Sequence, residues 1–170
     1  LRILGAVVGA MFVVAAFLPR IPQDPAYHRF ADARCLCGVP NAFDVWSNAP
    51  FVVVGVLGLC AVRRGGAARF HDPAERPAWI VAFAGIAATG FGSAYYHLAP
   101  TNETLVWDRL PMTVVFAAVV ATQIGERVGA VAGRRFLVPL LIFGAATVFY
   151  WDATEARGVG DLRWYGLMQF

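Results

Sequence analysis

Long apolar blocks separated by short polar segments constrain the fold of this chain more than any other feature. Of its 170 residues, 59% are hydrophobic and only 15% are charged, whereas soluble domains have about 45–50% apolar and about 25% charged residues. A helix of about 20 apolar residues crosses the roughly 30 Å of hydrocarbon in a bilayer. Because backbone groups in lipid must be hydrogen-bonded within the protein, these blocks predict membrane-spanning helices.

The blocks predict an all-α, polytopic transmembrane helix bundle that forms one integral-membrane domain over residues 1–170. It has five complete spans and the start of a sixth. The expected helices lie near residues 1–19, 49–62, 79–98, 109–124, 136–151 and 162–170. The first block has a signal peptide as its alternative, but no small-residue cleavage site follows it. Since the chain starts without Met and stops within an apolar run, we expect a C-terminally truncated piece of a protein with seven or eight helices.

All fourteen basic residues are arginine, which, with the richness in Ala, Gly and Val, is typical of a GC-rich bacterial genome. No basic patch is interleaved with exposed aromatic residues, so nothing indicates a nucleic-acid partner. The N-terminus and the loops after the second and fourth expected helices carry eight arginines, against six on the opposite side. Since cytoplasmic loops are enriched in basic residues, this predicts a cytoplasmic N-terminus in a bacterial inner membrane.

Segment 90–112 places three polar side chains at the ends of two adjacent apolar blocks. Ser93 and His97 are four residues apart, so they share one face of a helix. Asp108 follows a short turn at the start of the next block, from where it could fold back toward them. Each has an ordinary alternative, as an interfacial histidine, a serine bonded to its own backbone, or an aspartate that caps a helix. Together they indicate one site open toward the periplasmic side, because ionisable groups at membrane depth are costly.

Two further patterns flank this segment. The glycines at 90 and 92 follow no strand, so they do not form a dinucleotide-binding motif. We expect Gly90 and Gly92 to permit close helix packing instead. Upstream, Asn41, Asp44 and Asn48 recur at spacings of three and four, on one helical face at the membrane boundary. Helix capping would need only one of these three residues.

Two motifs resemble those of the alkaline ceramidase family. The first is Gly-x-Gly-Ser-x-x-x-His, then ten residues, then Asp-x-x-Pro-Met, which here runs from Gly90 to Met112. The second is Asp-Val-Trp-Ser-Asn at residues 44–48, which is similar to the family's Asn-x-x-Ser-Asn. The family consists of multi-helix membrane amidohydrolases, grouped with adiponectin-receptor-like proteins. The resemblance implies a hydrolase that cleaves the amide bond of ceramide-like lipids to a fatty acid and a sphingoid base.

The resemblance also implies metal ions. In the family, three histidines hold a zinc ion that carries the attacking water, and zinc lowers the pKa of that water toward about 7. By this resemblance His97 is the first zinc ligand. Ser93 would stabilise the oxyanion or the bound water, and Asp108 would act as general base or hold the water. The family also has a calcium site, for which the rough equivalents are Asp32, Asn41 and Asp44.

The chain departs from the family at its other two zinc ligands, a His-x-x-x-His pair on a late helix. The remaining histidines, His28 and His71, fall in predicted loops, and His71 falls on the opposite side of the membrane. We therefore expect this piece alone to be inactive. Two alternatives remain open. One is a receptor or sensor that keeps the fold without the chemistry. The other is a transporter. For a transporter we would expect helices broken by Gly or Pro at paired positions, and none is evident in this sequence.

Overall fold

The computed structural model describes residues 2–66 and 70–169, so Leu1 and Phe170, the ends of two predicted helices, lie outside it. Its α-helices are α1 (Arg2–Phe17), α2 (Ala42–Trp46), α3 (Ala49–Gly65), α4 (Arg76–Leu98), α5 (Asn102–Arg127), α6 (Ala130–Glu155) and α7 (Arg163–Gln169). Two short 3-10 helices are η1 (Pro25–His28) and η3 (Pro73–Glu75). Outside the helices, Leu36 and Val39 form an isolated bridge across a tight turn.

Within the described residues, four helical segments are long and apolar enough, judged by their length and composition, to cross a membrane. They are Ala42–Gly65, Pro73–Leu98, Asn102–Arg127 and Ala130–Glu155. The first helix is apolar but has only 16 residues, and α7 has seven. The predicted all-α membrane bundle is confirmed, with four spanning helices and a shorter α1 where five complete spans were expected.

The helices are longer than their apolar blocks because polar residues form the end turns. The clearest case is α5, which begins at Asn102 rather than near residue 109. The Thr101 hydroxyl accepts a hydrogen bond from the Thr104 amide, and the Thr104 hydroxyl accepts one from the Thr101 amide. This reciprocal pair is a capping box with Thr in place of the usual Glu or Gln. Asp108 and Pro111 therefore lie within α5, and Asp108 does not cap it.

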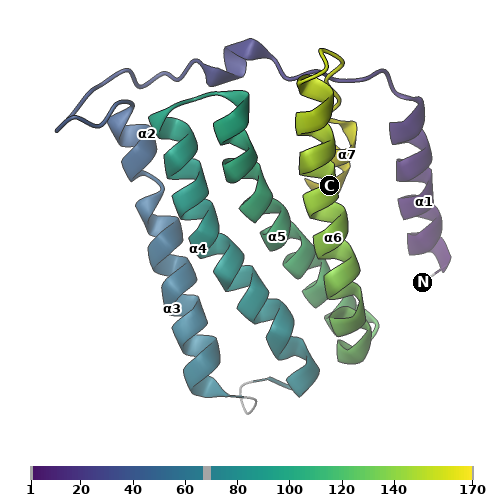
Figure 1. Cartoon of the computed structure of the whole chain (residues 1–170). Helices are drawn as coiled ribbons and strands as arrows, with labels where there is room; N and C mark the ends of the chain where they lie inside the picture. Colours follow the sequence, from purple (N-terminus) through teal and green to yellow (C-terminus); the bar gives the residue numbers. More distant parts are fainter. Residues whose placement is uncertain (1, 67–69, 170) are drawn as a thin grey trace.

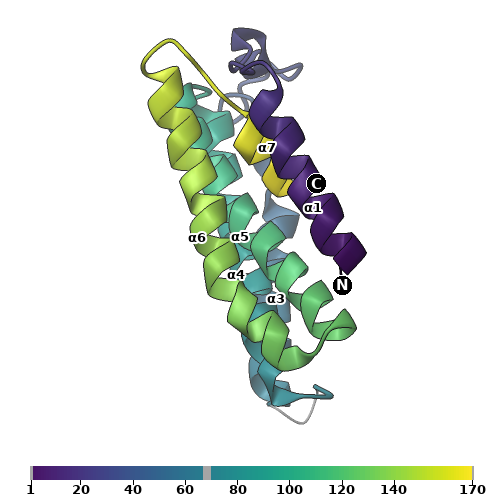
Figure 2. The same ribbon diagram turned by 90° about the vertical axis from the view of Figure 1, so that its right-hand side faces the viewer.

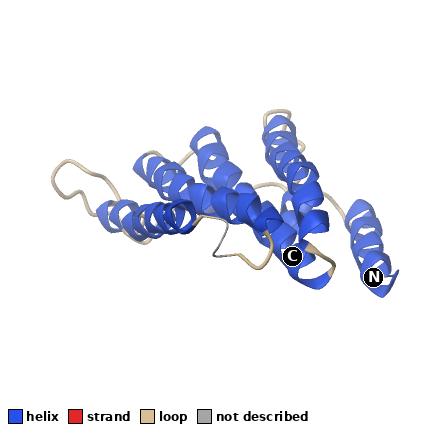
Figure 3. Ribbon diagram, turned by 90° about the horizontal axis from the view of Figure 1, so that it is seen from below, coloured by secondary structure: helices blue, strands red, loops and turns tan. Residues whose placement is uncertain are grey.

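Helices α3 to α6 lie side by side in chain order, with contacts between each neighbouring pair (Figure 1). The first helix stands beside α7 and α6 (Figure 2), where the ring centroids of Phe12 and Phe143 are 5.6 Å apart. Seen from below, the helices form an open row with the N-terminal helix at one edge (Figure 3). The segment 18–41, here called the strap, crosses the end of the bundle where α4 ends and α5 begins (Figure 1). We call this the site end.

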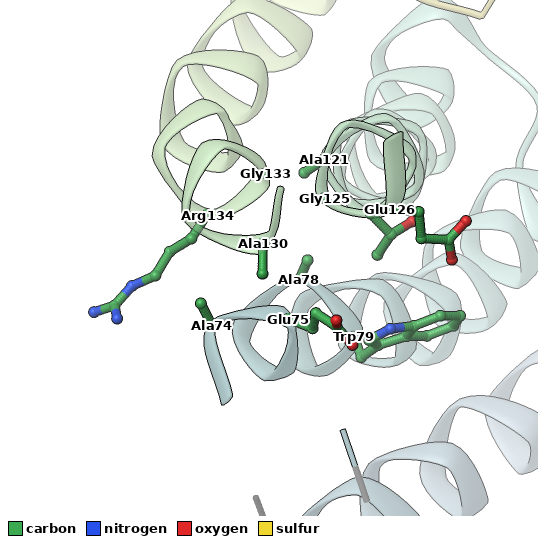
Figure 4. A pocket seen from close by; sticks show the side chains of 11 residues that line it. Ala74, Glu75, Ala78, Trp79, Ala121, Gly125, Glu126, Ala130, Gly133 and Arg134 are labelled. Atoms are coloured by element: carbon green, nitrogen blue, oxygen red, sulfur yellow. The ribbon is translucent and has the colours of Figure 1, made fainter. Parts of the chain in front are cut away.

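The opposite end of the bundle is packed through small residues. Ala78 of α4, Ala121 of α5 and Leu137 of α6 belong to one buried cluster. A Cβ atom at Gly133 would lie 2.5 Å from the Ala121 carbonyl oxygen, so α5 and α6 touch backbone to backbone there. The cavity between these helices measures only about 20 Å³ (Figure 4). That is room for about one water molecule, so this cavity is too small for a lipid chain.

Arg163 links α1 to the turn between α6 and α7. Arg163, at the start of α7, is 2.7 Å from the fully buried Asp161 carboxylate, which also accepts a hydrogen bond from the Tyr150 hydroxyl. Arg163 also donates to the carbonyls of Ala15 and Leu18, at and just after the end of α1. The hydrogen bonds from Arg163 hold the pKa of Asp161 below its usual range. The α6–α7 turn and α1 are thus held together by one guanidinium.

Candidate active site

The three polar residues of segment 90–112 line one cavity of about 400 Å³ at the site end of the bundle. Ser93 and His97 lie one turn apart on α4, and Asp108 comes from the second turn of α5. Most of the remaining wall is apolar; it consists of Tyr27, Asn48, Phe51, Ile86, Thr89, Met112, Val115 and Phe116. The size is within the range of about 300–1,000 Å³ that is usual for small-ligand sites. A few polar groups in a largely apolar cavity are the usual layout of such sites.

Two of the ionisable groups in this cavity are shielded from solvent, whereas Ser93 is half-buried. Asp108 is 8% exposed, and the Nδ1 atom of His97 is buried. Within the described residues, that nitrogen finds no hydrogen-bond partner. A buried polar atom without a partner is uncommon and costs about 1–3 kcal/mol. The His97 ring is therefore free, on one nitrogen, to bind a group that is not part of the described chain.

The glycine pair at 90 and 92 brings three helices together next to Ser93. A Cβ atom at Gly90 would lie 2.9 Å from the backbone nitrogen of Val52, on α3. A Cβ atom at Gly92 would lie 2.0 Å from the carbonyl oxygen of Trp107, on α5. That carbonyl has no helical donor, because the residue four positions later is Pro111, which lacks an N–H. The expectation that these glycines permit close packing is confirmed.

The strap holds the same end of α4 and α5 in place. The side-chain amide of Asn41 donates to the His97 carbonyl oxygen at 2.8 Å. His28 bonds the Tyr96 hydroxyl and the Asn102 side-chain oxygen through its two ring nitrogens, each at 2.9 Å. Since both of its nitrogens are occupied, His28 acts as a clamp between the strap and the two helices. The third histidine, His71, is exposed near η3 at the other end of the bundle, as the sequence predicted.

These residues fit one part of a zinc site and not the whole of it. An unpartnered imidazole nitrogen is a suitable zinc donor, and the residue that carries it, His97, lines a cavity that also holds a carboxylate and a hydroxyl. Across the described ranges, however, no three His, Cys, Asp or Glu side chains group closely enough to hold a metal ion. Zinc needs about three protein ligands in a catalytic site, so at least two more donors are required.

The predicted calcium ligands gather around the start of α2, where each already takes part in a hydrogen bond. The Asp32 carboxylate accepts a hydrogen bond from the Phe43 amide at 2.9 Å and pairs with Arg34 at 3.2 Å. Asn41 uses its side-chain amide on His97, and Asp44 contributes its backbone carbonyl to Asn48. Of the three side chains, the Asp32 carboxylate is therefore the one whose oxygen atoms already have partners. Calcium binding by Asp32, Asn41 and Asp44 stays a prediction.

A match to a known protein family covers most of this helical bundle. A model of the ceramidase family matches residues 39–157, which include α2 to α6 and all three polar residues of the cavity. The chain belongs to the ceramidase family. No curated protein and no solved structure gives a significant match. The family assignment and the four spanning helices support a ceramide-hydrolysing membrane enzyme with a lipid substrate.

The sequence interpretation gave no role to Tyr27 and Arg109, of which the first lines this cavity and the second lines an adjoining one. Tyr27, from the strap, lines the cavity beside Asp108, and no local pattern links a residue so far upstream to α5. Arg109 was counted among the loop arginines, yet it is only 5% exposed. The signal for its burial is the threonine pair that starts α5 at Asn102, since that start moves Arg109 from the first residue of the expected helix to the second turn of α5.

Proposed function

We propose that this protein is a zinc-dependent membrane amidohydrolase that cleaves the amide bond of ceramide-like lipids to a fatty acid and a sphingoid base. The observation that carries the proposal is the cavity in which Ser93, His97 and Asp108 meet within a mostly apolar wall. A buried site of this kind suits an amide whose two tails remain in lipid. Phe51, Ile86 and Phe116 supply apolar surface for the chains next to the reacting bond.

His97 would hold the zinc ion through its free ring nitrogen, together with ligands that the described residues do not supply. A bound zinc ion supplies an acidified water at neutral pH and polarises a carbonyl oxygen. We assign a role in proton transfer to Asp108. It takes the proton of the attacking water as the carbon–oxygen bond forms, and returns it to the nitrogen as the carbon–nitrogen bond breaks. The Ser93 hydroxyl donates a hydrogen bond to the carbonyl oxygen, where negative charge develops.

The test compares zinc content and hydrolysis in purified variants of a protein that includes the remaining zinc ligands. His97→Ala should lose stoichiometric zinc and the hydrolysis of a ceramide. Asp108→Asn should keep zinc and lose about 10²–10⁴-fold in rate, the usual contribution of a positioned acid or base. His71→Ala is the matched control, since that histidine is exposed at the opposite end. Undiminished zinc in His97→Ala would refute the metal assignment, and a zinc-loaded wild type without hydrolysis would favour the receptor alternative.

We also propose that the protein lies in a bacterial inner membrane with its site end toward the periplasm. Two basic pairs support this orientation: Arg63 with Arg64 at the end of α3, and Arg134 with Arg135 at the start of α6. Both pairs lie at the end opposite the cavity (Figure 1). Basic residues are enriched on the cytoplasmic side of membrane proteins.

A further inference from the structure

Arg109 is a buried cation without a counterion in the described part of the chain. It is 5% exposed, and the ion pairs found there are Asp32–Arg34 and Asp161–Arg163. Its Nη2 atom donates to the side-chain oxygen of Gln23, which is neutral. Its Nη1 atom is buried and finds no hydrogen-bond partner among the described residues. Burying a charge is costly unless the charge is paired, so this site calls for an anion.

Aromatic rings surround the Arg109 guanidinium, but they satisfy only part of its binding capacity. The guanidinium carbon lies 4.1 Å from the ring centroid of Trp151, 4.9 Å from that of Tyr165 and 5.7 Å from that of Tyr27. Rings attract a guanidinium over their faces. They do not provide acceptors in the guanidinium plane, where the N–H groups point. The rings therefore fix the orientation of Arg109 and leave the donors at Nη1 for a ligand.

A second cavity of about 400 Å³ adjoins Arg109, and we call it the α7 chamber. Its wall includes Tyr165, Gly166 and Gln169 of α7. Three residues, Tyr27, Asp108 and Met112, line both this chamber and the cavity of Ser93 and His97. The two spaces therefore meet at Asp108, the residue to which we assign proton transfer.

We propose that the α7 chamber binds the carboxylate of the fatty acid released by amide hydrolysis, with Arg109 as its counterion. The nature of this ligand rests on the proposed function. An acid released beside Asp108 is ionised at neutral pH, and the two carboxylates repel each other. Arg109 lines the same chamber as Asp108, so a carboxylate that moves away from Asp108 within this chamber can pair with Arg109. The planar guanidinium matches a carboxylate in shape, charge and donor geometry.

The chamber favours a carboxylate over the phosphate of a phospholipid headgroup. Arg109 is the one basic residue in its lining and Asp108 the one acidic residue, so the chamber offers a single guanidinium and no second cation for a more highly charged group. Met112 and Leu162 supply apolar surface for a single alkyl chain. A phosphodiester brings a glycerol and two chains, and Arg109 is too deeply buried to meet it at the membrane surface.

The experiment measures binding of radiolabelled oleate to the purified protein in phosphatidylcholine nanodiscs. Unlabelled oleate should displace the label from the wild type, while oleyl alcohol of the same chain length should not. Arg109→Gln should weaken oleate binding roughly 10- to 100-fold, the range expected for losing a hydrogen bond to a charged group. Arg109→Lys should restore part of it, because the charge remains. Arg157→Gln, at an exposed arginine of the same end, is the matched control and should bind as the wild type does.

The wild-type competition does not depend on whether Arg109 variants fold, and two of its outcomes would overturn the proposal. If oleyl alcohol displaces oleate equally well, the carboxylate is not recognised. If phosphatidylglycerol displaces it equally well, the site takes headgroup phosphates instead. Oleate binding is measured without turnover, so it is separate from the proposed function. If the protein binds oleate through Arg109 but hydrolyses no amide, the proposed reaction is refuted and the carboxylate site is supported.

Discussion

At the scale of single residues, Asn41 links the strap to the backbone of the proposed zinc ligand. It adopts a left-handed conformation with φ 47° and ψ 44°, and its side-chain amide donates to the His97 carbonyl at 2.8 Å. Asparagine tolerates this conformation better than other residues with a Cβ atom. One side chain thus meets two requirements, a backbone turn into α2 and a hydrogen bond to the last turn of α4.

Two substitutions at Asn41 separate these requirements. Asn41→Gly keeps the left-handed conformation and removes the hydrogen bond, which should cost about 1 kcal/mol. Asn41→Ala removes the bond and adds the left-handed penalty of about 1–2 kcal/mol. Thermal unfolding should therefore rank wild type above Gly and Gly above Ala, and both variants should hydrolyse ceramide more slowly. Equal unfolding temperatures for the wild type and Asn41→Gly would mean that the bond to His97 contributes nothing.

At the scale of helices, the backbone contact between α4 and α5 joins the two helices that carry Ser93, His97 and Asp108. Gly92→Ala would place a methyl group 2.0 Å from the Trp107 carbonyl oxygen, which is backbone and cannot rotate away. The helices must separate, at a cost of about 1–3 kcal/mol or more, and Ser93 moves with α4. We expect a lower unfolding temperature and a large loss of hydrolysis, although no polar group is removed.

The matched control for Gly92→Ala is Gly9→Ala on α1. A Cβ atom at Gly9 meets no atom within 4 Å, and alanine favours a helix by up to about 1 kcal/mol over glycine. Gly9→Ala should therefore unfold at the same temperature as the wild type or a higher one. If Gly92→Ala behaves in the same way, the close approach of α4 and α5 is not required.

The helices also show what the sequence could and could not predict. Apolar blocks determine which segments cross the membrane, because lipid excludes unpaired backbone, and that prediction is confirmed. Helix ends depend on caps, and the Thr101–Thr104 pair reads as a turn unless it is recognised as a capping box. Missing it placed the start of this helix near residue 109, with Asp108 just before it. Contacts from distant segments, such as those of Tyr27 and His28 of the strap, leave no local pattern at all.

At the scale of the whole molecule, the strap and the cavity occupy one end, and the ends of α3 and α5 occupy the other (Figure 1). The charge asymmetry between these ends is the basis for a periplasmic site end. The chain carries natural probes of this orientation, since Cys35 and Cys37 are exposed on the strap. Its other described cysteine, Cys60, lies within α3, at membrane depth.

The proposed orientation predicts that a membrane-impermeant maleimide labels Cys35 and Cys37 in intact spheroplasts. A second variant reports on the opposite end: Arg64→Cys, at an exposed position at the end of α3, in a background with serine at 35 and 37. It should be labelled only after the membrane is permeabilised. The serine background without Arg64→Cys shows how much signal comes from Cys60. Labelling of Arg64→Cys in intact spheroplasts, with protection of the strap, would place the cavity on the cytoplasmic side. In that case the positions of the basic residues would reflect packing within the bundle and not the enrichment of basic residues on the cytoplasmic side.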